Sequence, residues 1–487
     1  MSTFKKIAIA LAVFLVVAGA ALWWITRPVP ALHTLEETSG TDPVLAEPAP
    51  QFFPTVGIAK PIGWADGEAP TAAAGLAVNR FAEGLDHPRV IYTMPNGDVL
   101  VTLTKAPPGE VAGGWLTNLV AGFLFSEAGA GGPSADQIVL LRDADGDGVA
   151  EERHILREGL SSPSGMAWHD GTLYVANHDA VLRFAYEEGA TALTGEGEKI
   201  ADLPPAGNHW MRNILLDPEG TRLYVAVGSA SNIGEGGMEI EEGRAAIHEI
   251  NLETGSTRIF AAGLRNPNGL AWNPWSGELW TTVNERDMLG SDLVPDYMTN
   301  VPLGSHYGWP WVYYGDVVDE RVKMAMPRFL TSYTRVPEYA LGAHTAPLGM
   351  VFTQGGTRMG DAFARGAFIA RHGSWNRYPP GGYDVVFVAF DERGNPLAKP
   401  VTVLESFLAN EDETRGRPTW VAWDGTGALL VSDDTAGIIW RVVNPTAAPG
   451  AAPQRNRGAR LPPRRNLIGD PARAFEEPPA DLMPGSF

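Results

Sequence analysis

The sequence predicts an all-β fold, a six-bladed β-propeller, behind an N-terminal transmembrane anchor. A hairpin-like pattern recurs along the 487 residues, with units that begin at Gly84, Gly159, His209, Gly263, His344 and Arg417. Amphipathic helical stretches of about 10–15 residues, which a parallel α/β fold would need, are scarce. The 56 Gly, 39 Pro and 15 Trp indicate many turns and an aromatic interior. A seven-bladed propeller is the alternative, if an insertion hides one of the units.

The first 27 residues predict a membrane anchor. Lys5 and Lys6 precede an uncharged run from Ile7 to Ile25 that would be roughly 28 Å long as a helix, close to a bilayer core. The lysines favour the cytoplasmic side, which places the main domain in the periplasm or outside, anchored in the inner membrane. The alternative is a signal peptide cleaved near Ala18-Gly19-Ala20, which would release a secreted protein.

Composition divides the rest of the chain. Residues 28–75 are rich in Pro and Ala and predict a linker; residues 76–443 hold the propeller domain; residues 444–487 form a Pro- and Arg-rich C-terminal tail. The apolar stretch Gly113–Phe125 interrupts the first unit. It either lies on a membrane or over the channel mouth, or forms a helix buried against the propeller.

Each unit follows the same order, which predicts where side chains meet. A β-like run leads into a turn of Gly, Asp, Asn or Pro, and a second β-like run follows, as in the segment "PRVIYTMPNGDVLVT" from Pro88. The segment that opens each unit precedes its first strand, so these segments should gather on one rim of the propeller. Asn208-His209 and Arg265-Asn266 open two of the units, and we expect them to lie together.

Charge and cysteine content exclude several functions. The net charge of −20 disfavours nucleic acid as a partner, because phosphate binding needs a basic face. The chain has no Cys, which excludes disulfides, thiolate metal sites, a Cys nucleophile and a Cys-based haem attachment. A small neutral or cationic substrate fits this charge better.

Five motifs resemble a known family. "FAAGLRNPNGLAW", "VNERDMLGSDLVPDY", "HYGWPW", "HTAPLGM" and "HGSWNR" occur in this order and are similar to motifs of the soluble glucose/sorbosone dehydrogenases, above all the L-sorbosone dehydrogenase branch. The resemblance spans roughly residues 78–443. It implies a six-bladed propeller that holds pyrroloquinoline quinone and Ca²⁺ and oxidises an aldose or a sorbosone-like sugar aldehyde.

The resemblance also implies roles for individual residues. His209 matches the general base, and Arg265 matches the arginine that binds the quinone and stabilises developing negative charge. Asn266, Asn268 and Arg417 match further cofactor-binding positions. The carbonyl groups that would hold Ca²⁺ fall at Glu285, Arg286 and Asp287.

Three positions depart from the family pattern. The lysine of the fifth blade is missing, and Ser374 and Arg377 are the nearest substitutes. Thr419 stands where a second arginine is common, and Ser229 stands where an aspartate lies near the base. With two cations lost, the sequence predicts weaker cofactor binding or a changed pose.

The predicted function is therefore sugar oxidation outside the cytoplasm. Since the chain has no haem motif, electrons would pass to a separate acceptor, a quinone pool or a cytochrome. Two alternatives stay open: a Ca²⁺-dependent propeller lactonase, and a binding propeller without chemistry. "DADGDGVAEE" from Asp143 resembles an EF-hand loop, but its twelfth position is His154, so a tight turn competes with a structural Ca²⁺ site. His344 and His372 either line the channel or serve structure, and His306 is expected to pack on aromatic neighbours.

Overall fold

The computed structural model describes residues 3–51, 55–107, 127–129, 131–205 and 207–448. Within these residues the strands form six sheets of four or five antiparallel strands, together with two sheets of two strands. The inner strands of neighbouring sheets pack against one another around the ring, as β17 does against β23 and β23 against β28. The all-β six-bladed propeller predicted from the repeat is confirmed.

The first three blades follow the chain in order. Blade 1 holds β5 (Pro88–Thr93), β6 (Val99–Leu103), β7 (Gln137–Arg142) and β8 (Glu152–Arg157). Blade 2 holds β9 (Gly165–His169), β10 (Thr172–Ala176), β11 (Ala180–Ala185) and β12 (Glu198–Asp202). Blade 3 holds β13 (Ile214–Leu216), β14 (Arg222–Val227), β15 (Ala246–Asn251) and β16 (Thr257–Ala262), with a 3₁₀ turn η1 at Met238–Glu241.

The last three blades take in strands from the N-terminal segment. Blade 4 holds β17 (Asn266–Trp272), β18 (Leu279–Asn284), β19 (Pro295–Asn300), β22 (Tyr339–Ala343) and β1 (Ser39–Gly40). Blade 5 holds β23 (Pro347–Phe352), β24 (Gly366–Arg371), β25 (Asp384–Ala389), β26 (Val401–Glu405) and β3 (Thr71–Ala72), with η2 at Asp361–Phe363. Blade 6 holds β28 (Pro418–Trp423), β29 (Leu429–Asp433), β30 (Ile438–Val443) and β4 (Ala77–Ala82).

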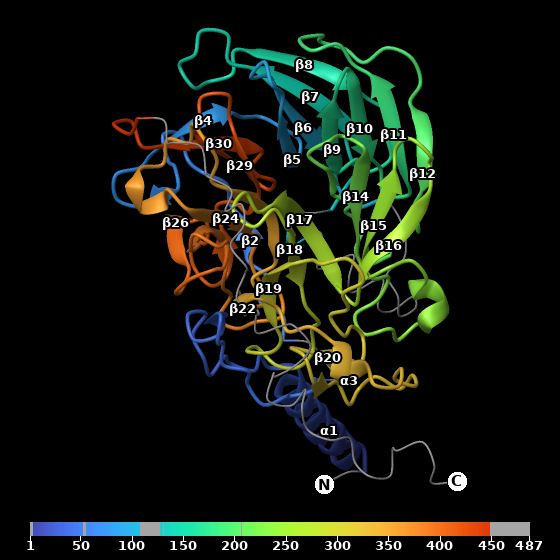
Figure 1. The fold of residues 1–487 in the computed structure, drawn as a ribbon. Coiled ribbons are helices and arrows are strands. Elements are labelled where there is room, and N and C mark those ends of the chain that lie inside the picture. The colour runs from blue at the N-terminus through green and yellow to red at the C-terminus, as the bar shows by residue number, and fades with distance from the viewer. Residues whose placement is uncertain (1–2, 52–54, 108–126, 130, 206, 449–487) are drawn as a thin grey trace, which may run out of the picture.

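The ring is closed by pairing the start of the domain with its end. β4 runs antiparallel to β30, with Val78 opposite Val442. Figure 1 shows this blue strand beside the red one. The pairing covers the outer edge of blade 6 and joins the two ends of the ring, which removes a free sheet edge. The hairpin pattern from Gly84 onward could not reveal this strand, because its partner lies more than 350 residues away.

A recurring glycine explains how the inner strands approach so closely. A Cβ added to Gly269 of β17 would lie 2.5 Å from the carbonyl oxygen of Leu348 on the next inner strand. A Cβ on Gly349 of β23 would lie 2.7 Å from the Cα of Trp420 in the same way. Only Gly leaves room for this backbone contact. The "PNGLAW" and "PLGMVF" segments of the repeat therefore report blade-to-blade packing.

The predicted linker over 28–75 is wrong for most of its length, because the segment packs along blades 4 to 6. β1, β3 and the short strand β2 (Lys60–Pro61) pair with β22, β26 and β27 (Glu413–Thr414). Side chains reinforce these pairs: Arg377 donates to the carbonyl of His33 at 2.7 Å, and the Trp64 indole donates to Asp433 at 2.9 Å. The Pro-rich composition hides these partners, which all come from distant parts of the chain.

The N-terminal helix α1 spans Thr3–Thr26. Among the residues that the structure describes, no helix has both the length and the hydropathy needed to cross a membrane, so the predicted anchor finds no support. The stretch Gly113–Phe125 and the tail beyond residue 448 lie outside the described residues. Between β19 and β22 an insertion carries β20 (Val312–Tyr313), β21 (Val317–Val318) and the short helix α3 (Leu330–Tyr333).

Candidate functional site

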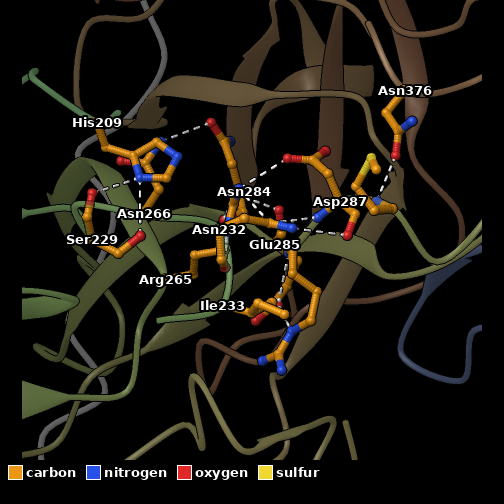
Figure 2. Close-up of polar contacts among 12 residues, drawn as sticks. His209, Ser229, Asn232, Ile233, Arg265, Asn266, Asn284, Glu285, Asp287 and Asn376 are labelled. Carbon is orange, nitrogen blue, oxygen red and sulfur yellow. Dashed lines mark hydrogen bonds and ion pairs between the residues drawn. The ribbon is translucent and has the colours of Figure 1, made fainter. Parts of the chain in front are cut away.

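One rim of the propeller collects polar side chains. Because adjacent strands run antiparallel, the loop before each inner strand and the loop after each second strand lie at the same end of a blade. His209 and Arg265 come from loops before inner strands, and Asp287 follows the second strand of blade 4. Figure 2 shows His209 and Arg265 in one group with the Asn284–Asp287 loop.

His209 is held through one ring nitrogen. Its Nδ1 lies 2.9 Å from the Ser229 carbonyl oxygen and 3.0 Å from the Ser229 hydroxyl. A Cβ built on Gly228 would lie 2.6 Å from the His209 Cβ and 2.4 Å from Asn266 Oδ1, so His209 and Asn266 are neighbours across this glycine. Within the described residues Nε2 has no hydrogen-bond partner. The half-buried imidazole thus offers Nε2 as its free nitrogen.

Burial changes the acidity of His209. Removal of the ring from water, together with the positive charge of Arg265, lowers the pKa of His209 to about 3, although Ser229 and Asp287 oppose the change. An unperturbed histidine has a pKa of about 6.5 and is partly protonated near neutrality. The structure instead favours an imidazole that is neutral throughout the physiological range.

Arg265 uses all of its donors within the protein. Its guanidinium donates to the carbonyl oxygens of Asn232, Asn284 and Glu285 at 3.1, 3.3 and 2.6 Å. The two remaining bonds go to Asn232 Oδ1 and Asp287 Oδ2, both at 2.9 Å. All five N–H groups of this arginine therefore have an acceptor within the protein. In this structure Arg265 clamps the loop after β18, and direct cofactor binding would require it to exchange a partner.

A buried ion pair extends this clamp. Asp287 Oδ1 lies 3.3 Å from His344 Nδ1, and His344 Nε2 lies 3.0 Å from the Gly290 carbonyl oxygen. Burial opposes both charges, yet Arg265 and His344 keep the pKa of Asp287 below its usual value, and Asp287 keeps that of His344 raised. Both nitrogens of His344 are engaged, so His344 serves the loop and leaves His209 as the histidine with a free Nε2 in this group.

Two of the three carbonyl groups predicted to hold Ca²⁺, those of Glu285 and Asp287, already accept hydrogen bonds from arginine side chains. The Glu285 carbonyl accepts from Arg265, and the Asp287 carbonyl accepts from Arg321 at 2.8 Å and from Asn232 at 3.1 Å. Arg286 has no exposed surface, and its guanidinium donates to Glu285 at 3.0 Å. Positive side chains thus lie against two of the carbonyls, where a further cation would be repelled.

The asparagines Asn266 and Asn268 lie on β17 beside His209. Asn266 donates to Asn284 Oδ1 at 3.2 Å, and Asn268 donates to the Asn266 carbonyl at 3.1 Å. The carbonyl of Asn268 accepts from Asn213 at 3.0 Å. Both residues are buried, and their side chains are tied to β18 and to the backbone of β17.

Ser374 and Arg377, the predicted substitutes for the missing lysine, serve structure. The Ser374 hydroxyl accepts from the Gly381 amide at 2.9 Å, and Ser374 is 1% exposed. Arg377 pairs with Asp292 at 2.9 Å and holds the N-terminal segment through His33. The loop after β24 turns these side chains toward its own backbone and toward residues 28–64, which the sequence did not show to be close.

A second polar group on the same rim centres on Asp434. Asp434 Oδ2 lies 2.5 Å from Arg89 Nη1, 2.9 Å from His372 Nε2 and 3.5 Å from His87 Nε2. Arg417 stacks over Tyr383 with its Cζ 5.1 Å from the ring centre. Burial alone would raise the pKa of Asp434, but the two histidines and Arg89 hold it well below the usual range. Burial also lowers the pKa of His87 to about 4.

Arg89 connects this Asp434 group to the His209 loop. Its Nη2 lies 2.8 Å from the Met211 sulfur, and its Cζ lies 5.6 Å from the Trp210 ring centre. Buried polar atoms without a partner among the described residues include Arg89 Nε, Arg417 Nε and Asp434 Oδ1. Buried donors without an acceptor in the described part of the chain, such as the Nε groups of Arg89 and Arg417, are unusual and point to a missing acceptor.

The sequence analysis did not identify Arg89 and Asp434, because "HPRVIYT" has the pattern of a strand and "SDDTAG" has the pattern of a turn.

Two other features lie away from this rim. Asp143, Asp145, Asp147 and Glu151 bring one carboxylate oxygen each within 4.8 Å of one another on an exposed loop of blade 1. A cavity of about 670 Å³ is lined by Ile58, Lys60 and residues 410–413, and it shares no residue with the His209 or Asp434 groups.

Comparisons with known proteins support the fold and the family. The TrAA12-like family model matches residues 137–302 and 330–445, more than half of the chain. A Hypocrea jecorina protein named pyrroloquinoline quinone-dependent sugar dehydrogenase is 23% identical over 321 residues, 55% of this chain and 71% of that protein. A Borreliella burgdorferi protein with no described activity is 29% identical over 307 residues, 60% of this chain and 79% of its own. The holo pyranose dehydrogenase quinone domain of Coprinopsis cinerea superimposes with a TM-score of 0.60 at 19% identity, covering 79% of this chain and 100% of that one.

Proposed function

The chain belongs to the TrAA12-like family, and on that premise we propose that it is a quinoprotein oxidoreductase that oxidises a sugar with pyrroloquinoline quinone. The Hypocrea jecorina relative carries a name that states this cofactor and a sugar substrate. A Coprinopsis cinerea protein named pyrroloquinoline quinone-dependent pyranose dehydrogenase is 35% identical over 133 residues, which are 23% of this chain and 17% of that protein. We propose an aldose or a sorbosone-like sugar aldehyde as the substrate. The His209 and Asp434 groups supply the side chains that such chemistry needs.

The observation that carries this proposal is the pair of unsatisfied arginines. Pyrroloquinoline quinone is a tricarboxylate, and guanidinium groups bind carboxylates strongly. Arg89 and Arg417 are both buried, each has an Nε without a partner among the described residues, and both lie beside Asp434 or its partner His372. These two arginines would hold the cofactor carboxylates. Arg89 thereby supplies a cation in place of one that this chain lacks at the family positions.

His209 is the proposed general base. Its Nδ1 is engaged by Ser229, which leaves Nε2 to face the substrate, and burial keeps the ring unprotonated at physiological pH, so Nε2 can accept the proton of a sugar hydroxyl. The low pKa also makes the imidazole of the cofactor-free protein a weaker base than one that titrates near neutrality. When bound, the quinone supplies a two-electron acceptor for the hydride that leaves the same carbon. Arg265 acts by positioning, since it fixes the loop after β18 beside His209.

No step is assigned to Ca²⁺. The carbonyls of Glu285 and Asp287 already accept from arginine side chains, so the protein itself places positive charge next to the loop. The guanidinium of Arg265 is close enough to His209 to act on its charge, and the same positive charge could stabilise negative charge that develops during oxidation.

We propose further that the electrons leave to a separate acceptor, a quinone pool or a cytochrome, and that the propeller works outside the cytoplasm. The lack of Cys, and with it of any Cys-based haem attachment, supports the first proposal. Lys5 and Lys6 before an uncharged run support the second. Fractionation of the full chain and of a form without residues 1–27 tests export: recovery of both in the cytoplasm would contradict it.

Titration of the cofactor-free protein with pyrroloquinoline quinone tests the proposed function. We expect a saturable change in quinone absorbance for the native protein. Arg417→Gln should weaken binding about 10- to 100-fold, the loss of one charge-assisted contact worth about 1.5–3 kcal/mol. Arg183→Gln, on the outer face of blade 2, is the matched control and should bind like the native chain. Equal affinities for both variants would show that the cofactor binds elsewhere.

A further inference from the structure

The hydrogen bonds around Ser229 show which atom accepts the proton of its hydroxyl group. Ser229 Oγ donates to the Ser231 carbonyl oxygen at 2.7 Å. A hydroxyl has one proton, so toward His209 the same oxygen can only accept. The Ser229 carbonyl, the other atom near His209 Nδ1, is also an acceptor. Nδ1 must therefore carry the hydrogen, and the lone pair is on Nε2 in the neutral ring.

A buried acid keeps this arrangement in place. Glu241 Oε1 accepts from the Ser231 hydroxyl at 2.5 Å, and Oε2 accepts from the Ala230 amide at 2.7 Å. Ser229 and Ser231 have no exposed surface, and Glu241 is 4% exposed. The loop from 229 to 231 is thus bonded at each residue, so the Ser229 acceptors cannot turn away from His209 at low cost.

The charges that face His209 do not stabilise its protonated form. Arg265 acts on the ring through its charge, and Arg212 donates to the His209 carbonyl at 2.9 Å; both disfavour a positive charge on the ring. Asp287 favours one, but its carboxylate already contacts Arg265 at 2.9 Å and His344 at 3.3 Å. Ser229, the residue in direct contact with Nδ1, is uncharged.

We propose that Ser229 is a positioning residue that fixes Nε2 as the proton-accepting nitrogen of His209 and, by being uncharged, sets the acid limit of the enzyme's working range. This inference rests on the proposed role of His209 as the base. With two neutral acceptors at Nδ1, the imidazole keeps its orientation but gains no counter-charge on protonation. Activity governed by this base should hold down to acidic pH, and a carboxylate at position 229 should move that limit upward.

The test compares Ser229→Asp with Ser229→Asn, two side chains of equal size that differ in charge. Histidine ¹⁵N NMR of the cofactor-free protein reads the tautomer and the titration of His209, which His209→Gln identifies. We expect Nδ1–H in the native protein and no titration of His209 between pH 5 and 8. In Ser229→Asp the titration should move up by about 1–3 pH units relative to Ser229→Asn. The low-pH fall in kcat/KM should move with it.

The outcomes separate this inference from the proposed function. A proton on Nε2, a native titration between pH 5 and 8, or equal titration of the Asp and Asn variants would overturn the role of Ser229. If the variants do not fold, the native tautomer and titration decide by themselves. Failure of the protein to bind the quinone or oxidise a sugar would remove the proposed function while these NMR results stood.

Discussion

Replacing Arg89 with methionine should destabilise the fold and weaken cofactor binding together. Arg89 is 8% exposed, and its guanidinium meets Asp434 at 2.5 Å. Methionine keeps the apolar stem but leaves Asp434 in the interior with one cation fewer. Removal of one partner of a buried ion pair costs about 3–5 kcal/mol. The variant also loses a proposed carboxylate contact, which should weaken quinone affinity about 10- to 100-fold.

The remaining partners of Asp434 determine how the loss of stability in Arg89→Met depends on pH. His372 at 2.9 Å and His87 at 3.5 Å stay beside the carboxylate, and Arg89 lowers the pKa of both in the native protein. Without Arg89 those pKa values should rise. A histidine pKa raised in the folded state adds stability at low pH that is lost as pH increases. The stability deficit of Arg89→Met should therefore be smaller at pH 5.5 than at pH 8.

Urea unfolding followed by tryptophan fluorescence measures this deficit, and quinone absorbance measures affinity. Arg183→Met is the control, because the Arg183–Glu198 pair is exposed and should contribute less than about 1 kcal/mol. Arg89→Lys, which keeps the charge, should recover part of the stability. Equal stability of the Arg89→Met and Arg183→Met proteins, or a deficit that does not change with pH, would refute the reasoning.

Three further predictions follow from other contacts. Arg377→Ala should expose residues 28–64 to limited proteolysis, because it removes the bonds to Asp292 and His33, while a cleavage rate equal to native would show that the strand pairs alone hold this segment. Quinone affinity should be the same in EGTA and in excess Ca²⁺, since arginines already occupy the Glu285 and Asp287 carbonyls; a strong Ca²⁺ requirement would contradict this. Burial lowers the pKa of His87 to about 4, so the native protein loses free energy of unfolding as pH falls from about 6.5, the pKa of an unfolded histidine, toward 4. Between pH 7.5 and 4.5 the His87→Gln protein should therefore lose about 2–3 kcal/mol less free energy of unfolding than the native protein. Equal losses in the two proteins would contradict this prediction.

The repeat pattern allowed the blades and one part of the site to be predicted. Turn residues and β-branched runs recur with the hairpin spacing, and each opening segment comes just before an inner strand, which brought His209, Arg265 and Asn266 to one rim. These are local features, since they depend on residues within one blade. The contacts that complete the rim link blades through space: Arg89 with Asp434 joins residues 345 positions apart.

The errors have the same origin. Residues 28–75 look like a linker because their own composition shows no periodicity, yet their strand partners are β22 of blade 4, β26 of blade 5 and β27, which lies between blades 5 and 6 in the chain. Ser374 and Arg377 were matched to a missing lysine by position alone, whereas Arg377 turns toward His33 in that same segment. The low pKa of His209 depends on burial and on Arg265, and neither can be derived from the flanking sequence.

The most direct test of the central claim is a single turnover of sugar oxidation. Native protein and His209→Gln are loaded with pyrroloquinoline quinone without oxygen, an aldose is added, and quinone absorbance is followed. Both proteins should bind the quinone equally, since His209 is not one of the groups proposed to hold its carboxylates. The native protein should reduce it, and His209→Gln should do so about 10²- to 10⁴-fold more slowly because the base is lost. Reduction at equal rates, or no reduction by any aldose in the native protein, would contradict the account.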